Sequence, residues 1–200
     1  MLPPVTKTLL IANIAVFLLQ EFLGDILIVW FGLWPFHTPE AYGAGFTPWQ
    51  VITYGFLHGG LMHIGFNMLA LYMFGGQLEM VFGQRRFLVY YLGCIFAAAL
   101  TQLTVLSLVG GEAYPTVGAS GGVFGLLLAY GLLFPHHKVM LLFPPIPMPA
   151  WLFVTLYGLL EIFLGVTGTQ SGVAHFAHLG GMLGGWLLIR QWRRRPPGGY

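Results

Sequence analysis

Charge is scarce in this sequence. Only 7% of its 200 residues are Asp, Glu, Lys or Arg, whereas 57% are hydrophobic. A water-soluble domain carries about 25% charged residues, so this chain cannot cover a water-facing surface and is expected to be an integral membrane protein. Its net charge of +2 is too small to indicate nucleic-acid binding, and we expect a lipid bilayer, not a nucleic acid, as its surroundings.

Cysteine, aspartate and zinc-binding patterns are also missing. The single cysteine, Cys94, cannot form an intramolecular disulfide and has no second cysteine with which to bind a metal. Asp25 is the only aspartate, which argues against a paired-aspartate protease, and there is no HExxH motif. The lack of an internal repeat argues against a transporter built from inverted halves. We predict no cofactor and no metal, while four histidines at one depth keep a metal or haem site open as an alternative.

Long apolar runs are what the sequence does contain. A membrane-spanning helix needs about 20 apolar residues, and six runs qualify, over residues 8–24, 56–78, 86–109, 118–134, 149–167 and 172–190. With the N-terminus in the cytoplasm, all eight Lys and Arg fall on the cytoplasmic side, as the positive-inside rule expects. We predict an all-α membrane protein, a bundle of six transmembrane helices with both termini cytoplasmic. Residues 1–195 would form one domain and residues 196–200 a short disordered tail.

Two connections between the runs have unusual compositions. Residues 25–55 are rich in tryptophan, phenylalanine and proline, which predicts an external loop lying partly in the membrane interface. Residues 139–149 carry four prolines and cannot form a regular helix, so we expect an extended segment on the inner face.

Polar residues within the apolar runs are candidates for chemistry, because their burial in a membrane is costly. His58, His63 and Asn67 lie in the outer half of the second run, Ser120 begins the fourth, and His175 and His178 lie in the outer half of the sixth. These runs cross in the same direction, and His178 lies six residues, or roughly 9 Å, inside its run. The sequence therefore places a serine and a histidine at one level, as an activated nucleophile requires.

Glycines would let these two helices meet. The fourth run contains Gly118, Gly121, Gly122 and Gly125, and the sixth contains Gly180, Gly181, Gly184 and Gly185. Small residues four apart allow close helix packing, which a Ser–His hydrogen bond between helices needs. His63 and Asn67 are also four apart and share a helix face, so together with the Ser120 N–H they could hold an oxyanion.

These motifs resemble those of the rhomboid intramembrane serine proteases. The matching residues are Gly118-Ala-Ser120-Gly121, the HxxGxxxG series of His178, Gly181 and Gly185, the stretch from His58 through His63 to Asn67, and Gly75-Gly76 with Glu79, Gly83 and Arg86. The resemblance covers nearly the whole chain and is to the small six-helix bacterial form. It implies an intramembrane serine endopeptidase that works through an acyl-enzyme.

The resemblance also implies a role for each matching residue. Ser120 would be the nucleophile and His178 the general base of a dyad, with His63 and Asn67 completing the oxyanion hole. His58, Gly118, Phe124 and His175 would line the site, and Gly121, Gly125, Gly181 and Gly185 would serve helix packing. No aspartate is available to orient the His178 ring. Glu161 lies at membrane depth in the fifth run, and we expect a structural role for it.

Two positions depart from the family's pattern. Gln50 follows Trp49 where the family often has arginine, so a loop-ordering cation is missing. Phe124 stands where a tyrosine often packs on the histidine ring, which keeps the stacking and loses the hydroxyl.

Partners and location follow from the same resemblance. Single-pass membrane proteins would be the substrates, reaching the site laterally through movement of the fifth helix or of the 167–172 loop. The protein would be a multi-pass protein of the bacterial inner (plasma) membrane, with its site opening toward the extracytoplasmic side. A non-catalytic rhomboid-fold protein that binds membrane helices is the alternative.

Overall fold

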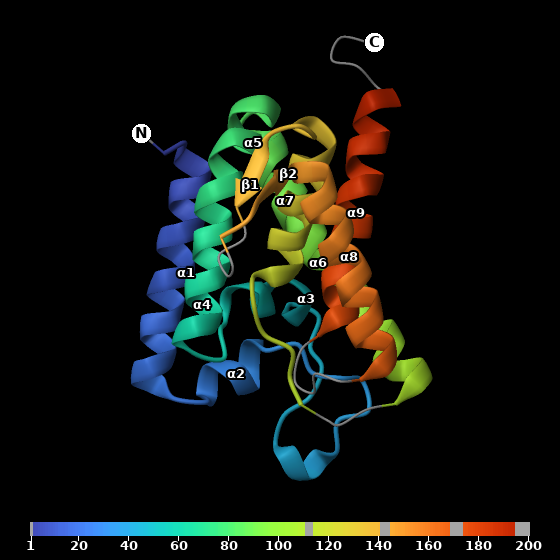
Figure 1. The fold of residues 1–200 in the computed structure, drawn as a ribbon. Coiled ribbons are helices and arrows are strands. Elements are labelled where there is room, and N and C mark those ends of the chain that lie inside the picture. Colours follow the sequence, from blue (N-terminus) through green and yellow to red (C-terminus); the bar gives the residue numbers. More distant parts are fainter. Residues whose placement is uncertain (1, 111–113, 141–144, 169–173, 195–200) are drawn as a thin grey trace.

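The computed structural model describes residues 2–110, 114–140, 145–168 and 174–194 (Figure 1). Its α-helices are α1 (Pro4–Leu23), α2 (Ile26–Phe31), α3 (Gln50–Thr53), α4 (Leu61–Ala70), α5 (Gly76–Phe82), α6 (Gln84–Val109), α7 (Ser120–Leu133), α8 (Ala150–Thr167) and α9 (His175–Arg194). Shorter turns are η1 (Glu40–Tyr42), η2 (Tyr54–Phe56) and the π-helical η3 (Leu71–Gly75). Strands β1 (Lys138–Met140) and β2 (Pro147–Pro149) pair antiparallel.

Helical structure occupies each of the six apolar runs. Helices α1, α6 and α8 are long and apolar enough to cross a membrane. The second run folds as α4, η3 and α5 in succession, α7 is a shorter apolar helix, and α9 takes the sixth run. The positions of the apolar segments were thus readable from hydropathy alone. The first residues of the sixth run, 172–173, and the tail 196–200 lie outside the described residues.

Two details of the predicted fold are wrong. The second run was expected to be helical from residue 56, but α4 begins only at Leu61, because Gly60 adopts a φ of 153° and stops the helix from extending backwards. His58 therefore lies ahead of the helix and not within it. The bundle is also not purely α-helical, since the proline-rich segment contributes the β1–β2 hairpin.

The helices form a bundle (Figure 1), and many of its exposed side chains are large and apolar. Large side chains point outward along the long helices, among them Leu18, Phe22, Phe163 and Val166. An apolar surface of this extent suits hydrocarbon and not water. The beginning of α1 and the end of α9 lie at one end of the bundle, whereas the segment between α1 and α4 lies at the other (Figure 1).

Glycines bring α6, α7 and α9 into close contact at the centre. A Cβ atom on Gly181 of α9 would collide with the backbone of Gly121 in α7, and one on Gly125 would collide with Cys94 of α6. The Tyr90 hydroxyl of α6 donates a hydrogen bond to the Gly125 carbonyl at 2.7 Å. Gly185, expected to serve the approach of α9 to α7, faces Tyr90 of α6. The glycines of α9 thus serve two neighbouring helices.

The segment between α1 and α4 fixes the position at which α7 begins. The backbones of Leu33 and Thr116 exchange hydrogen bonds of 3.0 and 2.9 Å, and the Gly118 N–H donates to the Tyr54 carbonyl at 3.0 Å. Gln50 orders this segment: its Oε1 accepts from the Trp34 N–H at 3.2 Å and its Nε2 donates to the Gly45 carbonyl at 3.0 Å. The neutral amide therefore does the ordering that we had associated with a missing cation.

Glu79 holds the opposite end of the bundle together. Its buried carboxylate accepts hydrogen bonds from the Val5 and Thr6 N–H groups at 2.9 and 2.7 Å and from the Thr6 hydroxyl at 2.8 Å. Carboxylates are favourable at a helix N-terminus because its N–H groups lack intrahelical acceptors and carry partial positive charge. This carboxylate fastens the first turn of α1 to α5.

Candidate active site

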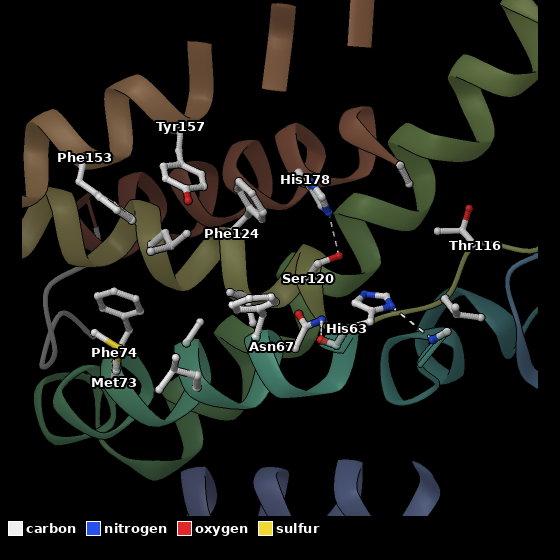
Figure 2. Close-up of a pocket in the computed structure, with 18 of the residues that line it drawn as sticks. His63, Asn67, Met73, Phe74, Thr116, Ser120, Phe124, Phe153, Tyr157 and His178 are labelled. Atoms are coloured by element: carbon white, nitrogen blue, oxygen red, sulfur yellow. Dashed lines mark hydrogen bonds between the residues drawn. The ribbon is translucent and has the colours of Figure 1, made fainter. Parts of the chain in front are cut away.

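Ser120 and His178 meet between α7 and α9 (Figure 2). Ser120 is the first residue of α7, and His178 lies one turn inside α9. The Ser120 Oγ lies 2.9 Å from the His178 Nε2, which is within hydrogen-bond distance. The ring of Phe124, one turn along α7, stacks on the imidazole of His178 with centroids 4.2 Å apart and planes 6° from parallel. The phenyl ring therefore covers one face of the imidazole and restricts its rotation.

Glu161 of α8 contacts the other nitrogen of His178. Its Oε2 lies 2.9 Å from the His178 Nδ1 and 2.7 Å from the His175 Nδ1. All three side chains are buried, with Glu161 7% exposed. Sequence reasoning missed this contact, having treated the serine and histidine as a dyad and Glu161 as structural. The usable signal was a carboxylate at membrane depth in an apolar helix, which is a functional candidate by default.

His63 presents a hydrogen-bond donor beside the start of α7. Its Nδ1 accepts from the Gly59 N–H at 3.3 Å, so the proton of the neutral ring resides on Nε2. That Nε2 lies against Gly118, where a Cβ atom would stand 2.7 Å from it. Gly118 has a φ of 129°, a conformation that favours glycine. Both properties of Gly118 thus keep the His63 Nε2 beside Ser120.

Asn67 lies one turn from His63 on α4. Its Nδ2 donates to the His63 carbonyl at 2.9 Å, which leaves the second amide hydrogen for another acceptor. Figure 2 shows His63 and Asn67 on one side of Ser120 and His178 on the other. The serine oxygen therefore has a base on one side and neutral donors on the opposite side.

A cavity of about 1060 Å³ opens beside Ser120. Its wall is mostly apolar and comes from α4, η3, α7, α8 and β1; it includes Phe66, Met73, Val123, Leu127, Val139, Phe153 and Tyr157. Phe124 also lines it, whereas the predicted lining residues His58, Gly118 and His175 are not part of its wall. His58 is buried with its ring 5.2 Å from that of His63, and His175 stands behind His178 on Glu161. The cavity can take an apolar chain up to the serine.

One group of side chains among the described residues has the donor atoms for a metal ion. Glu161, His175 and His178 place one ligand atom each within 4.8 Å of the other two. The same atoms are already hydrogen-bonded to one another. His58 and His63 lie outside this group, so the four histidines do not converge on one point.

The sequence matches the rhomboid domain over residues 45–195. The chain belongs to the rhomboid family. It is 34% identical to Rhomboid protein 1, mitochondrial, of Saccharomyces cerevisiae over 70% of its length, and 33% identical to Rhomboid protease GluP of Bacillus subtilis, again over 70%. It is also 26% identical to Rhomboid protease GlpG of Yersinia pseudotuberculosis over 96% of its length.

This rhomboid corresponds to only part of each of those relatives. It spans 42% of the yeast protein, 25% of GluP and 63% of GlpG. Family membership and the apolar helices together make it a membrane protein. The matched region contains Ser120, Glu161, His175 and His178, along with His63 and Asn67.

Proposed function

We propose that this rhomboid is an intramembrane serine endopeptidase with Ser120 as nucleophile and His178 as general base. The observation that carries the proposal is the 2.9 Å contact between the Ser120 Oγ and the His178 Nε2 next to an apolar cavity. A nucleophile and base within hydrogen-bond reach are the recognisable sign of an activated serine. Membership of a family that includes proteins named rhomboid proteases supports the same function.

The reaction divides into two acyl transfers. The Ser120 Oγ attacks the carbonyl carbon of a substrate peptide bond while its proton passes to the His178 Nε2. The resulting oxyanion receives hydrogen bonds from the His63 Nε2, the Asn67 Nδ2 and the Ser120 N–H. His178 then protonates the leaving amine, and the C–N bond breaks to leave an ester on Ser120. A water molecule then attacks this ester while His178 again takes the proton. The ester bond breaks, the acid product leaves and the Ser120 hydroxyl is restored.

The cavity suggests how substrates reach the serine. Its apolar wall suits a peptide segment that enters from the membrane. A substrate helix must unwind locally before cleavage, because its hydrogen bonds shield its peptide bonds. Helix α8 forms one side of the cavity and is the least buried of the three candidate spans among the described residues. Because so little of α8 is buried, single-pass membrane proteins would approach laterally beside it. Residues 169–172 of the loop that follows lie outside the described residues.

The positions of the basic residues support a six-helix topology with both termini on the cytoplasmic side. Lys7 lies in the first turns of α1, Arg85 and Arg86 begin α6, and Arg190 and Arg193 lie near the end of α9. The beginning of α1 and the end of α9 share one end of the bundle, as an even number of crossings requires (Figure 1). The cavity at Ser120 would then open toward the extracytoplasmic side of the inner membrane.

A fluorophosphonate probe tests the nucleophile directly. We expect purified wild-type protein to be labelled at Ser120 and to cleave a reporter membrane substrate. Ser120→Ala should remove both labelling and cleavage, and His178→Ala should abolish turnover while the protein still elutes as a single folded species in detergent. Absence of labelling in the wild type, with equal behaviour of Ser120→Ala on the reporter, would reject the protease and favour a non-catalytic protein that binds membrane helices.

A further inference from the structure

Glu161 is the one buried carboxylate among the described residues that contacts the proposed base. We infer that it is a positioning residue for His178, forming a Ser120–His178–Glu161 relay in which His175 anchors the carboxylate. The inference rests on the proposed function and adds a third member to the predicted dyad. It is carried by two hydrogen bonds that converge on one oxygen, the Glu161 Oε2.

The hydrogen bonds set the tautomer of His178. An ionised carboxylate only accepts hydrogen bonds, so the proton of the neutral imidazole is on Nδ1 where it faces Glu161. The Nε2 then carries the lone pair, and this is the nitrogen 2.9 Å from the Ser120 Oγ. Without Glu161, the ring could place its proton on Nε2, where it could not accept the serine proton. Glu161 thus selects the form of His178 that can act as a base.

The carboxylate also stabilises the charge that develops during the reaction. When His178 takes the serine proton it becomes an imidazolium, and a negative charge lies 2.9 Å from its Nδ1. The attraction is strong because both groups are buried from solvent. The interaction is greater in the transition state than in the ground state, so it should act on kcat more than on substrate binding.

His175 anchors the carboxylate from the same helix as the base. It lies three residues before His178, so both imidazoles project from one face of α9. Its Nδ1 donates to the Glu161 Oε2 at 2.7 Å, and the side chain is 5% exposed. Two donors on one oxygen leave the carboxylate little freedom to rotate away from His178.

The face of α8 that carries Glu161 is fitted to α9. Gly158 and Gly165 lie three residues before and four residues after Glu161, hence on the same face. A Cβ atom on Gly165 would approach the His175 Cβ to 3.3 Å, and one on Gly158 would lie 3.6 Å from the Met182 side chain. The tight contact at Gly165 brings α8 close enough to α9 for the Glu161 side chain to reach both histidines.

The comparison with Glu79 separates a relay from a purely structural carboxylate. Glu79 is also buried, and its partners among the described residues all belong to the N-terminal turn of α1 at the far end of the bundle. Replacing Glu79 should therefore change stability without changing the chemistry. Glu161 differs because one of its two partners is the base itself.

The experiment compares Glu161→Gln with Glu79→Gln in purified detergent-solubilised protein. Readouts are kcat and KM on a reporter membrane substrate, the rate of fluorophosphonate labelling, and the melting temperature. We expect Glu161→Gln to lower kcat and the labelling rate about 100-fold, the lower end of the contribution of general acid–base catalysis, with little change in KM. Glu79→Gln should lower the melting temperature and keep the kcat of the wild type.

A second pair of variants tests the anchor and does not alter the carboxylate. His175→Asn keeps an N–H donor near the place of Nδ1, whereas His175→Leu removes it. We expect His175→Leu to lower kcat about tenfold, in the range found when a supporting hydrogen bond behind a functional group is lost, and His175→Asn to restore most of it. This pair tests the role of His175 even if Glu161→Gln does not fold. Equal kcat values for His175→Asn and His175→Leu would show that His175 does not anchor Glu161.

The outcomes distinguish the relay from the protease function. If the wild type is labelled and cleaves substrate while Glu161→Gln has the same kcat, the relay is wrong and the serine protease stands. If the wild type is neither labelled nor active, the proposed function itself fails. Loss of wild-type activity on chelation, with recovery on adding Zn²⁺, would also overturn the relay, because a metal on Glu161, His175 and His178 would occupy the Nδ1 that the carboxylate needs.

Discussion

At the scale of single residues, Gly118 decides where the proposed oxyanion donor can lie. The His63 Nε2 occupies the space that a side chain at residue 118 would need. The backbone of Gly118 also turns with a φ of 129°, so that its N–H reaches the Tyr54 carbonyl and Ser120 begins α7 two residues later. The missing side chain of Gly118 thus leaves room for the His63 ring beside Ser120.

Gly118→Ala should impair catalysis more than it impairs folding. The new methyl group would push the His63 ring out of place, and loss of one oxyanion donor costs about 10²- to 10³-fold in kcat. Gly24→Ala is the matched control: Gly24 has a φ of 67° with open space around it, so this variant carries the backbone strain without the collision. We expect a lower melting temperature in both variants and a loss of kcat only in Gly118→Ala. Equal kcat values would show that His63 does not depend on Gly118.

At the scale of helices, the contact between α7 and α9 brings the serine to the histidine. Gly181 lies three residues after His178 and packs on the backbone of Gly121, which is adjacent to Ser120. Because a hydrogen bond of 2.9 Å tolerates little displacement, the distance between these two helices controls the Ser120–His178 contact.

Gly181→Ala should separate the two helices. Its methyl group would meet the Gly121 carbonyl, and overpacking of this kind costs about 1–3 kcal/mol. We expect a lower melting temperature and a strong loss of fluorophosphonate labelling, both measured on purified protein. Gly65→Ala in α4 has open space around its Cβ and should lose neither. Full labelling of Gly181→Ala would mean that the serine and histidine do not require this close packing.

At the scale of the whole molecule, the sequence predicted what hydropathy and residue spacing determine. Apolar runs located the helices because a chain in hydrocarbon must satisfy its backbone hydrogen bonds internally. The spacing of small residues indicated that α7 and α9 approach each other, and the motif registers placed Ser120 against His178. The stacking of Phe124 on His178 also follows from spacing, since four residues separate Phe124 from Ser120 on one helix face.

The remainder depended on how each helix is rotated about its axis. Nothing in the sequence of α8 says which neighbour Glu161 faces, because apolar residues surround it on every side and no amphipathic pattern sets the rotation. Likewise, Gly185 faces α6 and not α7, which only the three-helix packing decides. Position along a helix could be read from the chain, whereas the partners of Glu161 and Gly185 on neighbouring helices could not.

The topology makes a prediction that uses the one native cysteine as its control. Cys94 is fully buried between α6, α7 and α9, so its thiol should not react with a membrane-impermeant maleimide until the protein is denatured. Labelling of an introduced cysteine can then be measured without a contribution from Cys94. His37→Cys lies in the segment between α1 and α4, and Arg85→Cys lies at the beginning of α6; both side chains are exposed.

With cytoplasmic termini, intact cells should be labelled at His37→Cys and not at Arg85→Cys, and inverted membrane vesicles should show the reverse. The reason is that the basic residues of α1, α6 and α9 lie at one end of the bundle, which the positive-inside rule assigns to the cytoplasm. Labelling of both variants from one side would overturn the six-helix arrangement. Opposite labelling with Arg85→Cys outside would keep the bundle and invert it, so that the cavity at Ser120 would open toward the cytoplasm.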